Sequence, residues 1–122
     1  MKKKISIIGA GGKMGKWFSN YFTKNGFEVT GYDSENQLEK SVIQAKSLVG
    51  CVLDTEYVML CTPTKKTPEI IRLIAKEMKR GSHLIEISSQ KLKTASALSK
   101  MPTKIFPICI HPMFGPGVKK IK

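Results

Sequence analysis

Residues 5–22 read ISIIGAGGKMGKWFSNYF, a mostly apolar stretch that runs into glycines and then into aromatic residues. The apolar residues before the first glycine are typical of a strand that is buried on both faces of a sheet. Beyond the glycines, Met14, Phe18 and Phe22 recur at every fourth position, which places them on one face of a helix. Residues 25–26, Asn-Gly, are a typical end for that helix. A buried strand, a glycine-rich turn and an amphipathic helix therefore open the chain.

The rest of the chain continues this alternation of strands and helices. Thr67 and Pro68 predict a helix start, with a capping hydroxyl and a proline at the first helical position, and Gly81 predicts its end. Pro107 favours an edge position or an irregularity for the last strand, because proline cannot donate a ladder hydrogen bond. We expect further strands at residues 27–32, 41–46, 57–61, 83–87 and 105–110, and helices at 47–53, 68–80 and 91–100.

Strands that alternate with helices pair in parallel through right-handed crossovers. We therefore expect an α/β fold with a doubly wound, mainly parallel sheet of about six strands, formed by residues 1–122 as one domain. Ligands of such sheets bind beyond the carboxyl ends of the strands.

The turn after the first strand, residues 9–15, reads GAGGKMG. Its backbone N–H groups and the positive end of the following helix are suited to a dinucleotide pyrophosphate. The spacing is a variant of G-x-G-x-x-G with one extra residue before the helix, and its context between strand and helix predicts a Rossmann fold. The residues of this turn that we expect to bind the cofactor are Gly9, Gly11, Gly12, Lys13, Met14 and Gly15.

Asp33 lies 18 residues beyond Gly15, at the end of the second expected strand. A carboxylate at this position accepts hydrogen bonds from ribose hydroxyls and repels a 2′-phosphate, which favours NAD over NADP as the cofactor. Thr62 and Pro63 follow the fourth expected strand, where they would line the cofactor ribose.

Two further polar clusters follow the fifth and sixth expected strands, at residues 88–91 and 111–117. His111 begins the second cluster, and an imidazole with an ordinary pKa of about 6.5 accepts a proton at neutral pH. Oxidation of an alcohol needs such a base opposite the hydride acceptor, so His111 is a candidate catalytic residue. His83 opens a strand directly after a helix end, and we expect it to be structural.

Two stretches of this chain, residues 7–18 and 110–116, resemble the glycine loop and a signature motif of microbial prephenate dehydrogenases. Residues 89–91, Ser-Gln-Lys, resemble the Ser-x-Lys that the same family has after its fifth strand. The resemblance implies NAD-dependent oxidative decarboxylation of prephenate to 4-hydroxyphenylpyruvate, a step of tyrosine biosynthesis. It also implies that His111 hydrogen-bonds the ring hydroxyl and assists its deprotonation, while Ser89 contacts the same hydroxyl or the nicotinamide.

The family continues into a helical domain that forms a homodimer and supplies cationic residues for the substrate carboxylates. These 122 residues hold no counterpart of that domain, so we expect the chain to fold and bind NAD but to turn over prephenate poorly alone. Two alternatives stay open at this point: a non-catalytic NAD(P)-binding or sensing module, and a dehydrogenase of arogenate or another hydroxyacid.

Composition argues against several other classes of protein. Hydrophobic residues make up 41% and charged residues 25%, as in folded domains, and no apolar run reaches the roughly 18 residues of a membrane span. The three cysteines have no C-x-x-C spacing, which predicts buried thiols in a reducing cytoplasm and no metal site. The net charge of +12 comes mainly from lysines spread along the chain, which favours a solvated surface and leaves nucleic-acid binding as the last alternative.

Overall fold

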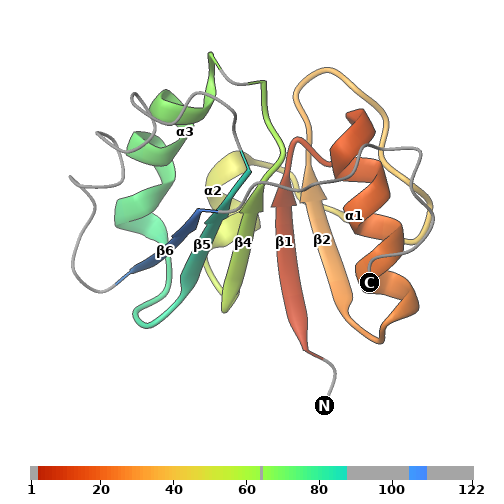
Figure 1. Cartoon of the computed structure of the whole chain (residues 1–122), viewed down its shortest axis with the longest axis horizontal. Helices are drawn as coiled ribbons and strands as arrows, with labels where there is room; N and C mark the ends of the chain where they lie inside the picture. The colour runs from red at the N-terminus through yellow and green to blue at the C-terminus, as the bar shows by residue number, and fades with distance from the viewer. Residues whose placement is uncertain (1–2, 64, 88–104, 110–122) are drawn as a thin grey trace.

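The computed structural model describes residues 3–63, 65–87 and 105–109, which form a six-stranded sheet with helices on both faces (Figure 1). The strand order is β3-β2-β1-β4-β5-β6, and every neighbouring pair is parallel. The elements in chain order are β1 (Lys4–Ile8), α1 (Lys13–Lys24), β2 (Glu28–Tyr32), β3 (Ile43–Gln44), α2 (Leu48–Val52), β4 (Tyr57–Leu60), α3 (Thr67–Ile74), the 3₁₀ turn η1 (Ala75–Glu77), β5 (His83–Glu86) and β6 (Phe106–Cys109). The expected doubly wound, parallel sheet is confirmed.

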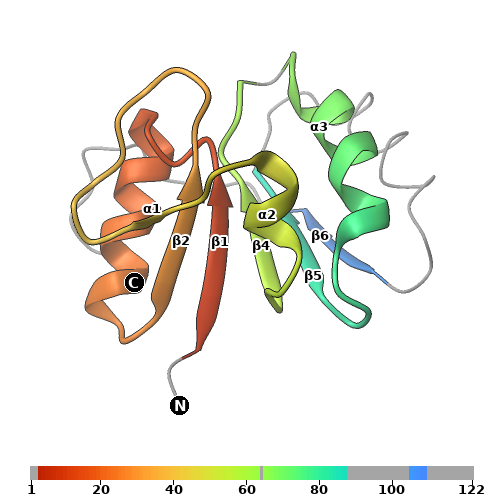
Figure 2. The ribbon, with the colours of Figure 1, turned by 180° about the vertical axis from the view of Figure 1, so that it is seen from behind.

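The helices lie in two layers, one on each face of the sheet (Figures 1 and 2). α1 packs on one face against β1 and β2, while α2 and α3 lie next to each other on the opposite face. The chain runs from β1 outward to β2 and β3, then returns to β4 on the other side of β1 and continues outward to β6. Such a reversal opens a crevice at the carboxyl ends of the strands, and the glycine turn after β1 lies there.

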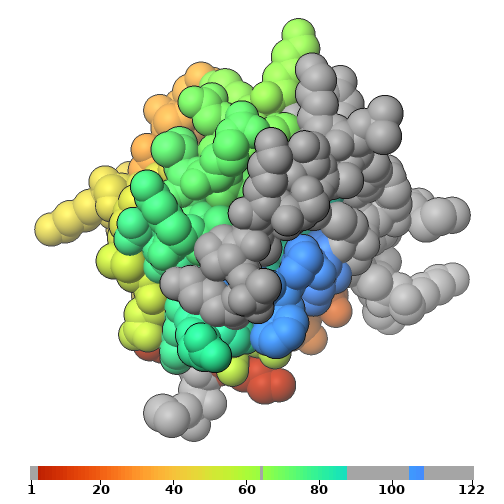
Figure 3. All heavy atoms as spheres, turned by 90° about the vertical axis from the view of Figure 1, so that its left-hand side faces the viewer, coloured from red at the N-terminus to blue at the C-terminus, as the bar shows by residue number. Residues whose placement is uncertain are grey.

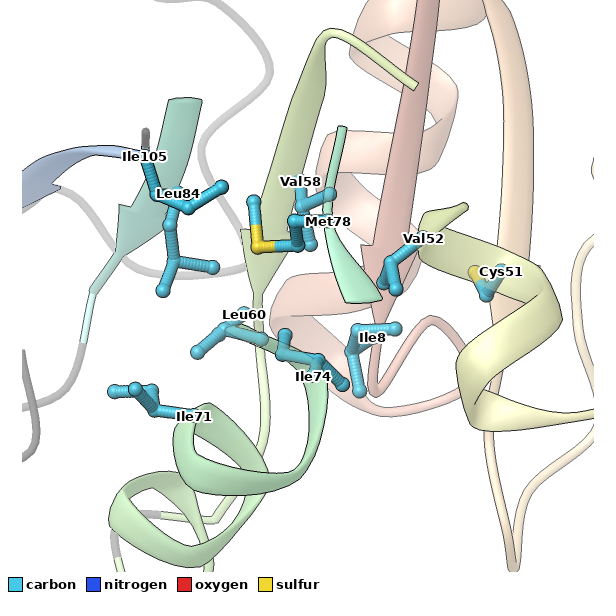
Figure 4. Close-up of a cluster of buried hydrophobic side chains, with 10 residues drawn as sticks. All are labelled: Ile8, Cys51, Val52, Val58, Leu60, Ile71, Ile74, Met78, Leu84 and Ile105. Atoms are coloured by element: carbon cyan, nitrogen blue, oxygen red, sulfur yellow. The ribbon is translucent and has the colours of Figure 1, made fainter. Parts of the chain in front are cut away.

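Each face of the sheet carries its own apolar cluster. β1 contributes to both, because Ile7 belongs to the cluster under α1 and Ile8 to the cluster under α2 and α3. The α1 side is rich in aromatic side chains, with Phe18 buried and Trp17 and Phe22 packed beside it. Strands that are apolar on both faces are what a sheet covered on both sides requires. The aliphatic cluster on the other side, drawn in Figure 4, contains Ile8, Cys51, Val52, Val58, Leu60, Ile71, Ile74, Met78, Leu84 and Ile105.

The ends of the first two helices follow the sequence signals. α1 ends at Lys24 with Asn25 as its cap, and Gly26 follows with a φ of 86°. Ser47 caps α2, since its Oγ accepts a hydrogen bond from the Gly50 N–H at 2.9 Å. Both signals are local, so the sequence alone was sufficient to read them.

The start of α3 differs from the expectation. Thr67 does not cap the helix, because it is already helical and Lys66 precedes the first turn without a side-chain cap. The Thr67 hydroxyl turns back to the preceding loop, where its Oγ1 lies 2.7 Å from Thr62 Oγ1 and donates to the Pro63 carbonyl at 3.3 Å. The Thr67 hydroxyl, which the sequence pattern predicted to cap the helix, therefore bonds the preceding loop instead.

The end of α3 also differs. The α-helix stops at Ile74 instead of residue 80, and the chain tightens into η1 before Met78 becomes extended with a ψ of 148°. The Met78 side chain is buried in the aliphatic cluster. The side chain of Met78 is thus buried although its backbone has left the helix. The apolar periodicity predicted its burial but not the early end of the helix.

β6 lies at the edge of the sheet that the structure describes, as Pro107 predicted. Within that sheet it pairs with β5, and Pro107 stands opposite Leu84. Phe106 and Ile108 are exposed, and Figure 3 shows β6 at the surface of the molecule. The helix expected at residues 91–100 lies outside the described residues.

Candidate functional site

The turn between β1 and α1 brings backbone into contact with backbone. Gly9 has a φ of 80°, and a Cβ on it would lie 2.5 Å from the carbonyl oxygen of Cys61, directly after β4. A Cβ on Gly15 would overlap the Gly9 carbonyl oxygen and come within 2.7 Å of the Ala10 Cα. Glycine at position 9 therefore allows the turn to pack against the chain after β4, and glycine at position 15 allows α1 to pack against the turn.

The start of α1 presents its positive end to a pocket. Gly12 precedes the helix without a side-chain cap, and the first turn holds no acidic residue. The first N–H groups of a helix have no carbonyl partner within that helix, and together they favour an anion. Gly12, Lys13 and Met14 line the pocket, so this end of it is suited to a phosphate group.

The pocket has a volume of about 470 Å³ and lies at the carboxyl ends of β1, β2 and β4. Its apolar lining comes from both sides of the reversal in the sheet, with Ile8 and Tyr32 at the strand ends and Leu48 and Ile70 on α2 and α3. A volume in this range suits part of a cofactor or another small molecule, since ligand pockets span about 300–1,000 Å³.

Asp33 joins two loops at one wall of this pocket. Its Oδ2 accepts a hydrogen bond from the Gly11 N–H at 2.9 Å, and its Oδ1 accepts from the N–H groups of Glu35 at 2.9 Å and Asn36 at 2.8 Å. Burial acts to raise the pKa of the Asp33 carboxyl, but the hydrogen bonds from Glu35, Asn36 and Gly11 outweigh it and hold that pKa below its ordinary value. The carboxyl is therefore ionised at neutral pH. Because Oδ2 has one partner among the described residues, it can accept a second hydrogen bond.

The loop after β4 forms the opposite wall. Thr62 and Pro63 line the pocket, with the Thr62 hydroxyl held by Thr67. Lys66 also lines it, and its Nζ lies 3.3 Å from Glu35 Oε1, which belongs to the loop after β2. Glu35 and Lys66 were not identified from the sequence. The one signal that could have indicated them is their position, because Glu35 closely follows β2 and Lys66 closely follows β4, and both strands end at the same crevice.

The structure brings most of the residues predicted to bind a cofactor to one place. Gly11 and Gly15 are the exceptions, since neither lines the pocket. A Cβ on Gly11 would meet Asn36 and a Cβ on Gly15 would meet the Gly9 carbonyl, so both glycines shape the turn. Both predicted catalytic residues, Ser89 and His111, lie outside the described residues. The predicted residues that do line the pocket are Gly9, Gly12, Lys13, Met14, Asp33, Thr62 and Pro63.

Other chemically versatile side chains lie in structural surroundings. His83 begins β5 at the amino end of the sheet, and its ring packs against Tyr57 and Phe106 with centroid distances of 5.4 Å. Burial raises the pKa of Cys51 to about 11 and that of Cys61 to about 12, so neither is a thiolate at neutral pH. Among the residues that the structure describes, no group of three or more His, Cys, Asp or Glu side chains could hold a metal ion. No helix in the same part of the chain is long and apolar enough to cross a membrane.

Residues 18–122 match the family model of the prephenate dehydrogenase nucleotide-binding domain. The chain belongs to the prephenate dehydrogenase family. The match starts in the middle of α1, so the assignment of the glycine turn rests on its geometry and its sequence pattern. A probable arogenate/prephenate dehydrogenase of Methanocaldococcus jannaschii is 30% identical over 124 residues, which cover 96% of this chain and 28% of that protein. The chain thus spans less than a third of that curated relative.

Solved structures with the same fold are other dehydrogenases and reductases. The 3-hydroxyisobutyrate dehydrogenase of Mycobacterium tuberculosis has a TM-score of 0.79 at 17% identity, over 95% of this chain and 42% of its own. A semialdehyde dehydrogenase NAD-binding protein of Cupriavidus necator, in complex with calcium and NAD, has a TM-score of 0.68 at 21% identity, over 93% and 42%. A reductive aminase of Aspergillus terreus, in complex with NADPH, has a TM-score of 0.70 at 16% identity, over 95% and 43%. At these identities the likeness shows the Rossmann fold alone.

Proposed function

We propose that this chain is the cofactor-binding domain of an NAD-dependent dehydrogenase that oxidatively decarboxylates prephenate to 4-hydroxyphenylpyruvate in tyrosine biosynthesis. The observation that carries the cofactor assignment is the Asp33 carboxylate, which the Gly11 N–H anchors at one wall of a pocket that also borders the positive start of α1. NAD carries ribose hydroxyls that donate hydrogen bonds and a pyrophosphate that is an anion, so these two features fit it. A 2′-phosphate would meet a carboxylate instead, which favours NAD over NADP.

Each pocket residue acts on the part of the cofactor that its chemistry suits. The Gly12 N–H donates to the Gly9 carbonyl at 3.2 Å, so the N–H groups at Lys13 and Met14 are those that would bind the pyrophosphate, and Asp33 would accept hydrogen bonds from the adenosine ribose. Thr62, with Pro63 beside it, lines the second ribose. When bound, the nicotinamide ring supplies the hydride acceptor.

We assign the chemistry on the substrate to His111 and Ser89, on the strength of the motifs in which they stand. His111 accepts the proton of the ring hydroxyl, and Ser89 contacts that hydroxyl or the nicotinamide. Loss of carbon dioxide makes the ring aromatic, so the protein mainly positions and polarises the substrate. In this proposal a helical domain outside these 122 residues supplies the cationic residues for the substrate carboxylates and the homodimer interface, and the enzyme works in the cytoplasm.

Titration calorimetry of the purified chain with NADH and, separately, with NADPH tests the cofactor assignment. We expect saturable binding that favours NADH. The Asp33→Asn variant should bind NADH about 10- to 100-fold more weakly, because hydrogen bonds to a charged acceptor are lost. Asp54→Asn is the matched control, since Asp54 is exposed, pairs with Lys79 and does not line the pocket. Binding of neither dinucleotide would contradict the proposal.

Turnover by the complete enzyme tests the substrate and the catalytic residues. The name of the Methanocaldococcus jannaschii relative covers arogenate as well as prephenate, so both substrates should be compared. His111→Asn should lower kcat by about 10²- to 10⁴-fold, as expected for loss of a general base, and should leave NADH affinity unchanged. Unchanged turnover in His111→Asn would remove the catalytic assignment, and absence of turnover with either substrate would favour a non-catalytic NAD-binding module.

A further inference from the structure

An ion pair joins the two walls of the pocket. Glu35 belongs to the loop after β2 and Lys66 precedes α3, and Lys66 Nζ lies 3.3 Å from Glu35 Oε1. Both residues line the pocket, and their side chains are 55% (Lys66) and 71% (Glu35) exposed. Exposed pairs of this kind contribute little to folding stability, so either member can be replaced without unfolding the protein.

Glu35 is held next to the carboxylate that we assign to the adenosine ribose. Its own N–H donates to Asp33 Oδ1 at 2.9 Å, so the two acidic residues occupy one short turn. Any group on the ribose 2′-position that approaches Asp33 therefore also approaches the turn that carries the Glu35–Lys66 pair. Lys13 and Lys66 are the cations that line this pocket among the described residues, and Lys13 lies at the start of α1, where the pyrophosphate is expected. Lys66 is the cation on the wall opposite Asp33.

We propose that the Glu35–Lys66 pair determines the cofactor selectivity of this domain by keeping Lys66 away from a 2′-phosphate. This inference rests on the proposed dinucleotide-binding function. With the pair intact, Glu35 neutralises the charge of Lys66, and a 2′-phosphate meets the Asp33 carboxylate without a free cation beside it. Without the Glu35 charge, Lys66 can pair with the phosphate, which carries about −1.5 to −2 charges at neutral pH. NADH lacks that phosphate, so its affinity does not depend on the pair.

Calorimetric titration of four forms of the protein with NADH and NADPH tests this inference: the unmodified chain, Glu35→Gln, Lys66→Gln and the double variant. We expect Glu35→Gln to bind NADPH about five- to tenfold more tightly than the unmodified chain, with NADH affinity within twofold. The double variant should lose most of the NADPH gain, because its source is Lys66. Lys79→Gln is the matched control for Lys66→Gln. It removes the lysine of another exposed ion pair, with Asp54, which does not line the pocket, and it should leave the NADH and NADPH affinities unchanged.

Two results would overturn the inference. If the unmodified chain binds NADH and Glu35→Gln leaves the ratio of NADPH to NADH affinities within twofold, the pair does not set selectivity and the proposed function stands. The same conclusion follows if the double variant keeps the full NADPH gain, because Lys66 would then have no part in it. If the unmodified chain binds neither dinucleotide, the proposed function and this inference fail together.

Discussion

Asp33 at the carboxyl end of the sheet and the side chains at its amino end have different kinds of partner. At the carboxyl end, backbone N–H groups from two loops converge on the Asp33 carboxylate, with Gly11 on one loop and Glu35 on the other. At the amino end, side chains interact with side chains: the His83 ring packs against its neighbours, and Lys4 pairs with Glu28 at 3.9 Å. Backbone donors cannot rotate away from a charge, whereas exposed side-chain pairs adjust freely. The difference predicts that substitutions at the carboxyl end act on ligand binding as well as on stability, and those at the amino end on stability alone.

Truncation of a buried side chain in the core between the two ends should have the largest effect on stability, because the whole sheet depends on that core. Leu84 is fully buried in the aliphatic cluster, so Leu84→Ala should lower the free energy of unfolding by about 2–5 kcal/mol. Leu73→Ala is the matched control on α3, because Leu73 is exposed, and it should change stability by less than about 0.5 kcal/mol. Urea unfolding measures both, and equal losses would mean that this cluster is not the core.

A methyl group in the glycine turn should affect stability and binding together. Gly15→Ala places a Cβ against the Gly9 carbonyl, and should lower the free energy of unfolding by about 1–3 kcal/mol and weaken NADH binding. Gly12→Ala is the control for stability, because its Cβ would lie 3.6 Å from the nearest atom, and it should cost only about 0.5 kcal/mol for the loss of glycine at the helix N-cap. Equal stability of the two variants would show that the backbone contact at Gly15 is not tight.

A change at the amino end should separate stability from binding. His83→Ala removes a ring that packs against Tyr57 and Phe106, which should lower the free energy of unfolding by about 0.5–1.5 kcal/mol. The same variant should bind NADH within twofold of the unmodified chain, in contrast to Asp33→Asn. Calorimetry and urea unfolding of both variants test the contrast, which fails if His83→Ala weakens NADH binding while it is fully folded.

The smallest effect expected is a pH dependence at the carboxyl end. Since the folded state holds the pKa of Asp33 below its unfolded value of 3.8, ionised Asp33 stabilises the fold above that pH. This contribution is lost as the pH falls through the lower, folded pKa. The stability difference between the unmodified chain and Asp33→Asn should therefore be constant from about pH 5 to 8 and narrow below about pH 4. Urea unfolding across this range measures it, and a difference that does not narrow would mean that the hydrogen bonds to Asp33 do not favour its charged form.

The parts of the fold that were predictable are those with a local cause. Three of them depend on the side chain or the backbone geometry of a single residue: the Ser47 cap of α2, the end of α1 near Gly26 and the edge position of Pro107. The predicted Thr67 cap was wrong because its hydroxyl bonds the preceding loop, at Thr62 and Pro63, instead of the helix. Both partners are close in the chain, but a threonine at a helix start can bond in either direction, and the sequence pattern does not distinguish the two.

The candidate site shows the same division. Asp33 and the glycine turn were predictable because a strand, a tight turn and a helix start have a recognisable pattern over a short length of chain. The Glu35–Lys66 pair was not, since its members are 31 residues apart and meet only when the chain returns from β3 to β4. Surface lysines are common in this sequence, so nothing local distinguished Lys66 from the others.

The sequence by itself determined the order of the elements, the parallel sheet, the position of the turn at the end of β1 and the family to which the chain belongs. These follow from apolar periodicity and from residues with restricted backbone geometry, which act over a few positions. Tertiary structure alone decided that two glycines of the turn pack against backbone instead of lining the pocket, that α3 ends early at Ile74, and that an acidic and a basic side chain meet across the crevice. The physical reason is that distant segments compete for the same space and the same hydrogen-bond partners, and that competition is settled only when the sheet is assembled.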